Sequence, residues 1–270
     1  MLVLNRPLAH RIEAAEAATY QSIQQALAEI PGNPWGAEWR QFGQAVALSV
    51  RHFASHSTLS NRVMCAGPGD EEDLARAIAF LAERITRVRV DISPLHSNPA
   101  FLDHLQGLGF RIGGFQVALF GEARAERHAL PTGVEIRRVE SDADAAQVAA
   151  IYPVGFDLPA WEDYSRDQIH ALWRRPEWRV YLALVDGQPA GMATLHMANG
   201  VGCLESACTL PAFRGRGIQT ALIRQRMADA AEAGCDLIVT QTGNGTISQN
   251  NMERLGLRIG YTKAEFYRPA

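Results

Sequence analysis

An internal repeat limits the folds that are open to this chain. The segment Leu-Gly-Phe-Arg-Ile-Gly at residues 108–113 resembles Leu-Gly-Leu-Arg-Ile-Gly at residues 255–260, which lies 147 positions later. The same spacing sets the apolar segment 88–92 against residues 235–239, and each of these lies between two stretches of helical pattern. Self-similarity at a fixed separation indicates duplicated structural units. We therefore expect two copies of one fold.

The length of the chain agrees with this expectation. At about 150 residues per domain, 270 residues correspond to roughly two domains. Residues 121–133 lack hydrophobic periodicity and contain Pro131 and Gly133, as a linker would. We place the boundary near residue 125, so that the domains span residues 1–125 and 126–270.

Composition excludes several classes of function. Hydrophobic residues make up 47% of the chain and charged residues 20%, as in a soluble globular protein. The 26 Lys and Arg nearly balance the 29 Asp and Glu, so we expect no nucleic-acid partner and no membrane partner. The N-terminal segment lacks the apolar core of a signal peptide, which favours a cytoplasmic protein.

The cysteines and histidines suggest no metal site. No Cys-x-x-Cys pair occurs, and free thiols in a reducing compartment are the simplest interpretation of the four cysteines. His170 and His196 are isolated in the sequence, as structural histidines usually are. The four cysteines are Cys65, Cys203, Cys208 and Cys235.

The second half has the pattern of a mixed α/β domain. Asp186-Gly187 predicts a tight hairpin turn between two strands, and Ser141 and Ser248 are expected N-caps of helices. The predicted strands are residues 134–139, 180–185, 189–197, 201–210, 237–240 and 261–267, with a helix at 218–233. These elements indicate a mixed sheet flanked by helices.

The segment 209–220 joins the end of a strand to the start of a helix. Helix N-termini bind anions because their first N–H groups lack intrahelical acceptors, and Gly215 and Gly217 allow close approach of a phosphate. A dinucleotide fold is not indicated, because Thr220 stands where its third glycine belongs. A P-loop lysine is also missing from this segment. An ordinary surface loop with helix-capping glycines is the alternative interpretation.

This segment resembles the central motif of the GNAT superfamily of acyl-CoA-dependent N-acyltransferases. The matching residues are Thr209-Leu-Pro211, Phe213 and Arg214-Gly-Arg-Gly217, and Gly260-Tyr261 matches a later family pattern. The resemblance covers about residues 134–270. It implies two GNAT-like domains, each with a mostly antiparallel central sheet flanked by helices. It also implies transfer of an acetyl or other acyl group from acetyl-CoA to a primary amine.

The resemblance assigns the CoA contacts to particular positions. Main-chain amides at the helix start would hold the CoA pyrophosphate, while Thr209 and Leu210 would pair with the pantetheine arm. An amide that polarises the thioester carbonyl would contribute about 2.7–4 kcal/mol. A helix asparagine of the family falls on Gln249 by spacing and on Asn251 by chemistry, and either could instead be a local capping group. The pyrophosphate contacts would be Arg214, Gly215, Arg216, Gly217, Ile218, Gln219 and Thr220.

The resemblance also implies an acid and a base. Glu205 lies four residues before Thr209, on the same side of a regular strand as Thr209 and Cys203, and is the expected base. The alternatives for Glu205 are an arginine partner or a solvated strand position. The family's proton-donating tyrosine falls on Gly256, which leaves Tyr261, Tyr267 or solvent to protonate the CoA thiolate.

The acceptor is expected to be an amine of a small molecule or a peptide, and the protein a monomer or homodimer. Aromatic and acidic residues in the early helical region would suit an amine, although most could serve the core: Phe156, Asp157, Trp161, Tyr164, Trp173 and Trp178. Transfer would be direct, within a ternary complex. Two alternatives remain open: a non-catalytic acyl-CoA-binding module, and an aminoacyl- or thiol-directed transferase of the tandem type.

The first half is expected to be a degenerate copy without a CoA loop. The 147-residue spacing sets residues 214–219 against Gly-Pro-Gly-Asp-Glu-Glu at 67–72. Acidic side chains at a helix start suit the helix dipole but repel a pyrophosphate. Two like charges 4 Å apart cost about 4 kcal/mol at an effective dielectric constant of 20.

Overall fold

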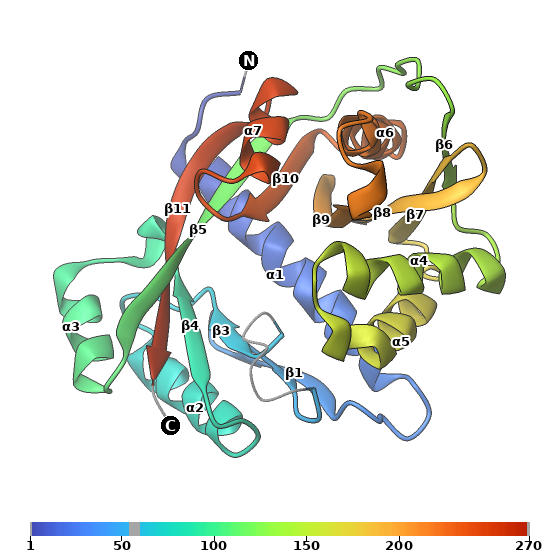
Figure 1. The fold of residues 1–270 in the computed structure, drawn as a ribbon. Coiled ribbons are helices and arrows are strands. Elements are labelled where there is room, and N and C mark those ends of the chain that lie inside the picture. The colour runs from blue at the N-terminus through green and yellow to red at the C-terminus, as the bar shows by residue number, and fades with distance from the viewer. Residues whose placement is uncertain (1, 54–59, 269–270) are drawn as a thin grey trace. The chain divides into compact units, whose positions relative to one another are not determined.

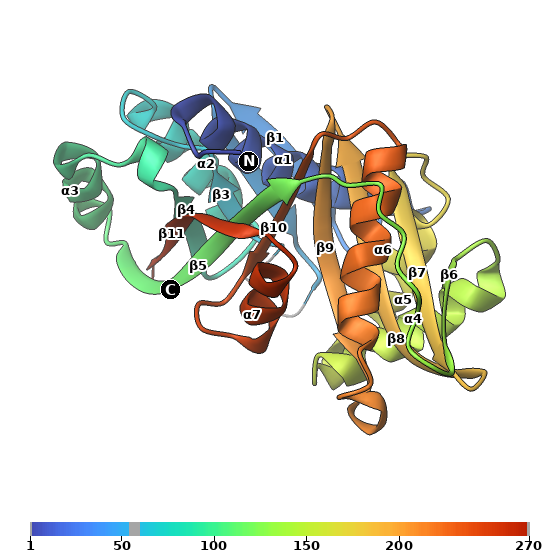
Figure 2. The ribbon, with the colours of Figure 1, turned by 90° about the horizontal axis from the view of Figure 1, so that it is seen from above.

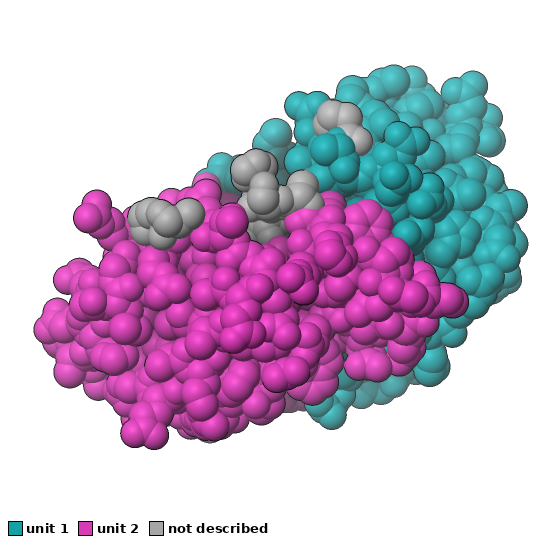
Figure 3. Space-filling view, turned by 90° about the horizontal axis from the view of Figure 1, so that it is seen from below, with its two compact units in different colours: residues 1–2, 119–241, 245–258 teal, residues 3–118, 242–244, 259–270 magenta. Residues whose placement is uncertain are grey.

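The computed structural model describes residues 2–53 and 60–268. Its contacts divide the chain into two compact units, coloured separately in Figure 3. Unit 1 contains residues 1–2, 119–241 and 245–258, and unit 2 contains residues 3–118, 242–244 and 259–270. Both units combine helices with mostly antiparallel strands, which confirms the mixed α/β class. No helix within the described ranges has the length and apolar character needed to cross a membrane.

Unit 2 is a sheet covered by helices (Figure 1). Its strand order is β1-β2-β3-β4-β11-β5, and β3 and β4 are parallel. Apolar residues of α2, α3 and these strands form the core, including Leu74, Phe80, Val90 and Phe101. The elements are α1 (Arg6–Ala28), β1 (Ala37–Phe42), β2 (Ala45–Val50), β3 (Arg62–Met64), α2 (Glu71–Ala82), β4 (Val88–Ile92), a 3-10 helix (Pro94–His96), α3 (Pro99–Gly107), β5 (Arg111–Glu122) and β11 (Arg258–Arg268).

Unit 1 carries α6 on one face of its strands and α4 and α5 on the other (Figure 2). Its strand order is β10-β9-β8-β7-β6, and only the β9–β10 pair among these is parallel. The elements are β6 (Val134–Arg138), α4 (Asp142–Gly155), a 3-10 helix (Pro159–Trp161), α5 (Glu162–Leu172), β7 (Trp178–Val185), β8 (Gln188–Ala198), β9 (Val201–Thr209), a 3-10 helix (Pro211–Phe213), α6 (Ile218–Glu232), β10 (Leu237–Thr242) and α7 (Ile247–Arg254).

The structure reproduces the repeat seen in the sequence. Helices α3 and α7 both end at a leucine followed by a glycine with positive φ, +84° at Gly109 and +90° at Gly256. The next residue then donates its N–H back into the helix, from Phe110 to Leu105 O at 3.0 Å and, in the second copy, from residue 257 to residue 252 at 3.1 Å. The same helix-end geometry, with an apolar strand before it and a strand after it, occurs twice.

The last strand of the chain pairs within unit 2. Residues Ala264–Arg268 of β11 run antiparallel to β4, with Ala264 opposite Ile92 and Arg268 opposite Val88. Unit 2 therefore contains segments from both ends of the described chain, whereas a single division near residue 125 would assign them to different domains. The division into domains 1–125 and 126–270 stays a sequence-based prediction.

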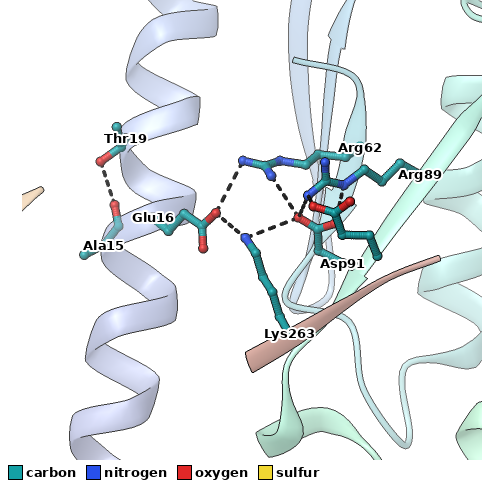
Figure 4. A network of polar contacts seen from close by, with 8 residues as sticks. Ala15, Glu16, Thr19, Arg62, Arg89, Asp91 and Lys263 are labelled. Carbon is teal, nitrogen blue, oxygen red and sulfur yellow. Dashed lines mark hydrogen bonds and ion pairs between the residues drawn. The ribbon is translucent and has the colours of Figure 1, made fainter. Parts of the chain in front are cut away.

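A buried network of charges holds β11 in unit 2 (Figure 4). Asp91 accepts hydrogen bonds from Arg62 and Arg89, both at 2.9 Å, and Lys263 lies 3.4 Å from the same oxygen. Glu16 on α1 contacts both Arg62 and Lys263. Burial alone would raise the pKa of Asp91, but Lys263, Arg62 and Arg89 together hold it well below its ordinary value. Charged side chains can be buried in this unit because each has a partner of opposite charge.

We expect Asp91→Ala to lower the free energy of unfolding by about 3–5 kcal/mol, because it leaves three buried cations without their shared partner. Urea denaturation followed by circular dichroism measures this change. Since folding lowers the pKa of Asp91, its stabilisation is present above the unfolded pKa of about 3.9 and is lost as the pH falls below it. The difference between wild type and variant should therefore shrink in acid.

The matched control is Asp103→Ala on α3, where the side chain is exposed. We expect a change within about 0.5 kcal/mol for this control. Equal stabilities of the two variants at neutral pH would contradict the assigned role of the network.

Candidate active site

The loop between β9 and α6 forms an uncapped helix N-terminus. Gly215 and Gly217 have φ values of +80° and +78°, which side-chain-bearing residues rarely adopt. Gly217 is the N-cap and has no side chain that could accept from the first turn, while Ala221 N is bonded back to Gly217 O at 3.0 Å. The amides of residues 218–220 lie before that first intrahelical bond. This geometry suits an anion.

The predicted CoA-binding residues divide into anchors and exposed groups. Ile218 is 1% exposed and anchors the start of α6 in the core, while Gln219 and Thr220 are half-buried. Arg214 and Arg216 are exposed. Arg214 Nε donates to Thr209 O at 3.3 Å, and the Arg216 guanidinium lies 5.8 Å from the centre of the Phe213 ring. Both arginines therefore stay close to the loop.

The corresponding loop of unit 2 is occupied by its own carboxylates. Asp70 Oδ2 accepts from Gly67 N at 3.1 Å, and the Glu71 carboxylate accepts from Gly69 N at 3.1 and 3.2 Å. Hydrogen bonds from main-chain N–H groups lower the pKa of Glu71. Amides that face a phosphate in an anion-binding loop are here bonded to side chains of the same loop.

A β-bulge places Glu205 beside two hydroxyl groups. Ala193 of β8 pairs with Ala207, and Leu195 pairs with Leu204, so Glu205 and Ser206 both lie opposite Thr194. Thr194 Oγ1 accepts from Ser206 N at 3.1 Å and donates to Glu205 Oε2 at 3.2 Å. Ser206 Oγ also donates to the Glu205 carboxylate.

The prediction that β9 is regular between Cys203 and Thr209 is wrong. The extra residue at the bulge interrupts the alternation of sides from which the position of Glu205 was derived. Glu205 is half-buried, and its described hydrogen-bond partners are hydroxyl groups of Thr194 and Ser206. Among the described residues, Glu205 is thus neither fully solvated nor hydrogen-bonded to an arginine, although its charge acts on the buried Arg226.

The sequence analysis did not identify Thr194, Ser206 or Tyr152. Tyr152 of α4 shares a hydrogen bond of 3.2 Å with Ser206, and its ring lies 4.9 Å from Phe156 and 6.4 Å from Trp161. The sequence shows only that Ser206 is next to Glu205. Thr194 contacts Glu205 because of the register between β8 and β9, and Tyr152 contacts Ser206 because of the packing of α4. Two of the predicted acceptor-site aromatics therefore border this polar group.

Other members of the predicted aromatic cluster belong to the core. Trp178 is 0% exposed and packs on His196, with ring centres 4.8 Å apart, and Tyr164 is 2% exposed. Burial lowers the pKa of His196 to about 4, which keeps its imidazole neutral at physiological pH. Burial raises the pKa of Cys208 to about 12, so its thiol stays protonated and does not act as a nucleophile.

A buried arginine lies beneath the bulge. Arg226 of α6 is 0% exposed and donates from Nη1 to Thr194 O and from Nε to Leu222 O, both at 3.1 Å. Burial lowers its pKa to about 10, while the charges of Tyr181 and Glu205 act in the opposite direction. Arg226 therefore remains a cation at neutral pH and fixes the β8 carbonyl next to the site.

Strands β9 and β10 pair only along part of their length. The parallel register runs from the Val201–Leu237 pair to the Cys203–Val239 pair, whereas β9 continues to Thr209. Past the end of β9, Leu210 N donates to Ala190 O at 2.8 Å and Leu210 O accepts from Phe213 N at 2.9 Å. A pantetheine arm at Leu210 would therefore use the carbonyl, which can accept a second hydrogen bond.

The remaining predicted site residues have local partners or belong to unit 2. Gln249 Oε1 accepts from Gly245 N at 2.7 Å, and Asn251 Oδ1 accepts from Arg254 at 3.4 Å. These contacts agree with the local capping interpretation. Gly256 ends α7 with positive φ, a conformation in which a tyrosine would be strained.

Tyr261 belongs to unit 2. Its side chain is 8% exposed, and burial followed by the nearby charges of Glu16 and Glu13 raises its pKa well above the ordinary value. Its hydroxyl has no hydrogen-bond partner among the described residues. The structure therefore gathers Glu205, Thr194 and Ser206 in unit 1 and places Tyr261 among acidic residues of unit 2.

A basic depression of about 310 Å³ lies in unit 1 near the middle of α6. The segment after β5 runs along this helix (Figure 2), and Arg127 bonds to Asp229 and Glu232. The sequence analysis did not identify this depression, because its lining comes from three separate segments. The residues that line it are Arg124, Glu126, His128, Arg224, Met227, Arg254, Leu255 and Gly256.

Comparisons with known proteins agree with this geometry. A model of the acetyltransferase (GNAT) family matches residues 145–257. Over 112 residues the chain is 32% identical to an aminoalkylphosphonate N-acetyltransferase of Salmonella typhimurium (strain LT2), a match that covers 38% of this chain and 71% of the relative. The chain belongs to the GNAT acetyltransferase family. The protein is accordingly an acyl-CoA-dependent N-acyltransferase.

Solved structures of GNAT proteins share the fold across both halves. A GCN5-related N-acetyltransferase from Kribbella flavida aligns with a TM-score of 0.65 and 20% identity, over 94% of this chain and 95% of that protein. A tandem GNAT protein from the clavulanic acid biosynthesis pathway aligns with a TM-score of 0.58 and 14% identity, over 76% of this chain and 74% of that one. These similarities concern the fold alone, and they confirm the resemblance inferred from the sequence.

We expect Thr194→Val to lower the free energy of unfolding by about 1–3 kcal/mol, because the buried Ser206 N–H loses its acceptor while the shape is kept. Thr194→Ser keeps the hydroxyl and is the control, with a smaller loss expected. Thermal or urea unfolding measures both. Equal stabilities of the Val and Ser variants would show that the hydroxyl does not hold the bulge.

Proposed function

We propose that the protein transfers an acetyl group from acetyl-CoA to the primary amine of a small molecule, directly and within a ternary complex. The observation that carries this proposal is the uncapped N-terminus of α6, in the same unit as a half-buried carboxylate at a strand bulge. Holding both substrates in one complex removes much of the entropic barrier, so that no covalent enzyme intermediate is required.

The CoA pyrophosphate binds at the start of α6 in this proposal. The amides of residues 215–220 supply hydrogen-bond donors, and Arg214 and Arg216 add positive charge nearby. The basic depression lined by Arg124, Arg224 and Arg254 provides a place for a further CoA phosphate in the same unit. Thr209 and Leu210 remain the proposed contacts of the pantetheine arm, and Gln249 and Asn251 the proposed helix contacts.

Glu205 is the proposed base. An ammonium group must lose a proton before nitrogen can attack the thioester carbonyl, and a carboxylate can take this proton directly or through one water. The Thr194 and Ser206 hydroxyls donate to Glu205 and so fix its carboxylate. Donation from these groups leaves the other carboxylate oxygen to meet the amine.

Tyr261 remains the proposed proton donor to the departing CoA thiolate. Burial and nearby acidic groups raise its pKa, so the phenol carries its proton at neutral pH. Gly256, which stands at the family's usual tyrosine position, has no hydroxyl to offer. The hydroxyl of Tyr152 belongs to the same unit as Glu205, and solvent is a further source of the proton.

A small amine is the proposed acceptor. The relative from Salmonella is named for acetylation of an aminoalkylphosphonate, a compact primary amine. Phe156 and Trp161, next to Tyr152, offer aromatic faces that attract a cationic amine. We propose a cytoplasmic location and a monomer or homodimer, as the sequence analysis expects.

Unit 2 is proposed not to bind a second CoA at its equivalent loop. The Gly67 and Gly69 amides already bond to Asp70 and Glu71, and these carboxylates repel a pyrophosphate. One CoA per chain in a calorimetric titration would support this assignment, and two would contradict it.

We expect Gly217→Val to raise the Kd for CoA by about ten- to a hundredfold. A Cβ at Gly217 lies 3.1 Å from Pro131 Cγ and is strained by the positive φ, so the loop must shift and lose charge-assisted hydrogen bonds of about 1.5–3 kcal/mol. Isothermal titration calorimetry measures the change.

The matched control is Gly234→Val at the other end of the same helix. Gly234 also has positive φ, +87°, but has open space around it. It therefore introduces comparable backbone strain without touching the loop, and its Kd for CoA should change less than about twofold. If both variants bind CoA equally well, the pyrophosphate does not bind at this loop.

We expect Glu205→Gln to lower turnover by about 10²–10⁴-fold and to abolish the decrease of rate toward acidic pH, because the variant has no carboxylate to protonate. CoA affinity should stay the same. A thiol-release assay over a panel of small primary amines, including an aminoalkylphosphonate, measures turnover. Glu135→Gln, at an exposed position of β6, is the control.

An unaltered pH–rate profile in Glu205→Gln would remove Glu205 as the base. Binding of acetyl-CoA by the wild type without release of CoA for any amine in the panel would instead favour the non-catalytic binding module. These two outcomes are separated because the first requires turnover and the second excludes it.

A further inference from the structure

Unit 2 contains a group of metal-ligand side chains that the acetyl-transfer site does not use. His10, Glu13 and His96 each direct one ligand atom toward the others, and these atoms lie within 4.8 Å of one another. Among the described residues, this is the one group of three or more His, Cys, Asp or Glu side chains whose ligand atoms all lie this close to one another. The sequence analysis missed it because His96 is more than eighty residues from the other two.

The local structure explains why these three side chains meet. His10 and Glu13 are three residues apart on α1, so they lie on one face of the helix. His96 ends the 3-10 helix Pro94–His96, and its Nε2 lies 2.7 Å from Glu13 Oε2. The His10 and His96 rings approach edge to face, with centres 5.5 Å apart. Two rigid elements therefore present the ligands.

A glycine allows the position of the His96 ring. A Cβ at Gly67 would lie 2.8 Å from His96 Nδ1 and 2.9 Å from His96 Cβ, closer than such atoms pack. The backbone at Gly67 thus fits against one side of the ring, while Nε2 on the other side faces Glu13. The ring is held in the orientation that a ligand needs.

Burial and access also suit an ion. The Glu13 and His96 side chains are only 9% and 13% exposed, whereas His10 is exposed. A shallow depression of about 380 Å³ is lined by Ala9 and Leu95, the chain neighbours of His10 and His96, together with residues 4–6 and Pro94. An ion could enter from this side, with His10 as the ligand that closes over it.

We propose that His10, Glu13 and His96 bind one divalent transition-metal ion, most naturally Zn²⁺. Two imidazoles and a carboxylate are a preferred ligand set for Zn²⁺, with bonds of about 2.0–2.2 Å and water in the remaining position. Ligand atoms that share an ion lie at most about 4.2 Å apart at these bond lengths, so rotation of the exposed His10 completes the site. The ion would join α1 to the 3-10 helix.

The alternative is an ion pair without metal. Hydrogen bonding to Glu13 raises the pKa of His96 even though burial opposes it, which is the behaviour of a His–Glu pair that binds a proton. Asp70 and Arg6 also act on His96, with opposite signs. A proton and a metal ion compete for the same Nε2 atom, and His10, which has a ring contact with His96, becomes a ligand when the metal is bound.

His10→Ala is therefore the decisive variant. Its side chain is exposed, so the fold and the His96–Glu13 pair should survive. Full-length protein without an affinity tag, treated with a chelator and dialysed, is titrated with ZnCl₂ by calorimetry and with CoCl₂ by visible absorption. We expect one ion per wild-type chain and intense visible bands for a Co²⁺ site of low coordination number.

In His10→Ala the Kd for Zn²⁺ should rise by more than about 100-fold, since even outer contacts of metal sites contribute 10–100-fold. His52→Ala, an exposed histidine of the same unit, should bind as the wild type does. Cys65→Ser is a second control against binding by a thiol. The proposal fails if the wild type binds no Zn²⁺ or if His10→Ala binds it equally well.

This test does not depend on the proposed acetyl transfer. Metal binding is measured without acetyl-CoA or an amine, and His10, the residue changed in the decisive variant, is not among the residues proposed for acetyl transfer. Failure of either proposal leaves the other intact.

Discussion

The pairing of buried charges determines which segments can form unit 2. Asp91 and Glu16 are almost completely buried. The three cations around them are buried as well: Arg62, Arg89 and Lys263. Burying an unpaired ion costs several kcal/mol. Each segment that contributes a charged side chain to this interior must therefore place it next to a side chain of opposite charge. Because Lys263 lies on β11 and pairs with Glu16 and Asp91, the network favours β11 over another apolar strand as the neighbour of β4. Hydrophobic packing alone would not distinguish between two similar strands of a repeat.

A different constraint shapes unit 1. One additional residue in β9 brings Glu205 and Ser206 opposite a single threonine, and the same strand continues beyond its pairing with β10. In the proposed function, both irregularities allow backbone groups and a carboxylate to face a substrate instead of another strand. In the equivalent loop of unit 2, acidic side chains accept hydrogen bonds from main-chain amides, whereas the N-cap glycine of α6 in unit 1 has no such side chain. The proposed function therefore assigns CoA binding to only one of the two loops.

Features that depend on neighbours in sequence were predictable. Asp186-Gly187 forms the expected hairpin, Ser141 caps α4, and Gly215 and Gly217 adopt the positive φ that the loop requires. The predicted cap at Ser248 is wrong, because the N-cap is Thr246, two residues earlier, which accepts from Gln249 N. The partners of Glu205 could not be predicted, since they depend on the register between β8 and β9. Two further contacts also depend on packing between segments far apart in the sequence: β11 pairs with β4, and His96 contacts Glu13 on α1. Hydrophobic periodicity within a segment cannot predict such contacts.

The place of β11 in unit 2 has a consequence for biosynthesis. Domains generally begin to fold while the ribosome is still translating, with N-terminal parts first. Lys263 is synthesised long after Arg62, Arg89 and Asp91. Until then the two arginines and the two acids of the network lack the third cation, which contacts both acids in the folded unit. Until β11 is synthesised, β4 lacks the neighbour that it has in the folded unit, and an unpaired strand edge favours association with other chains.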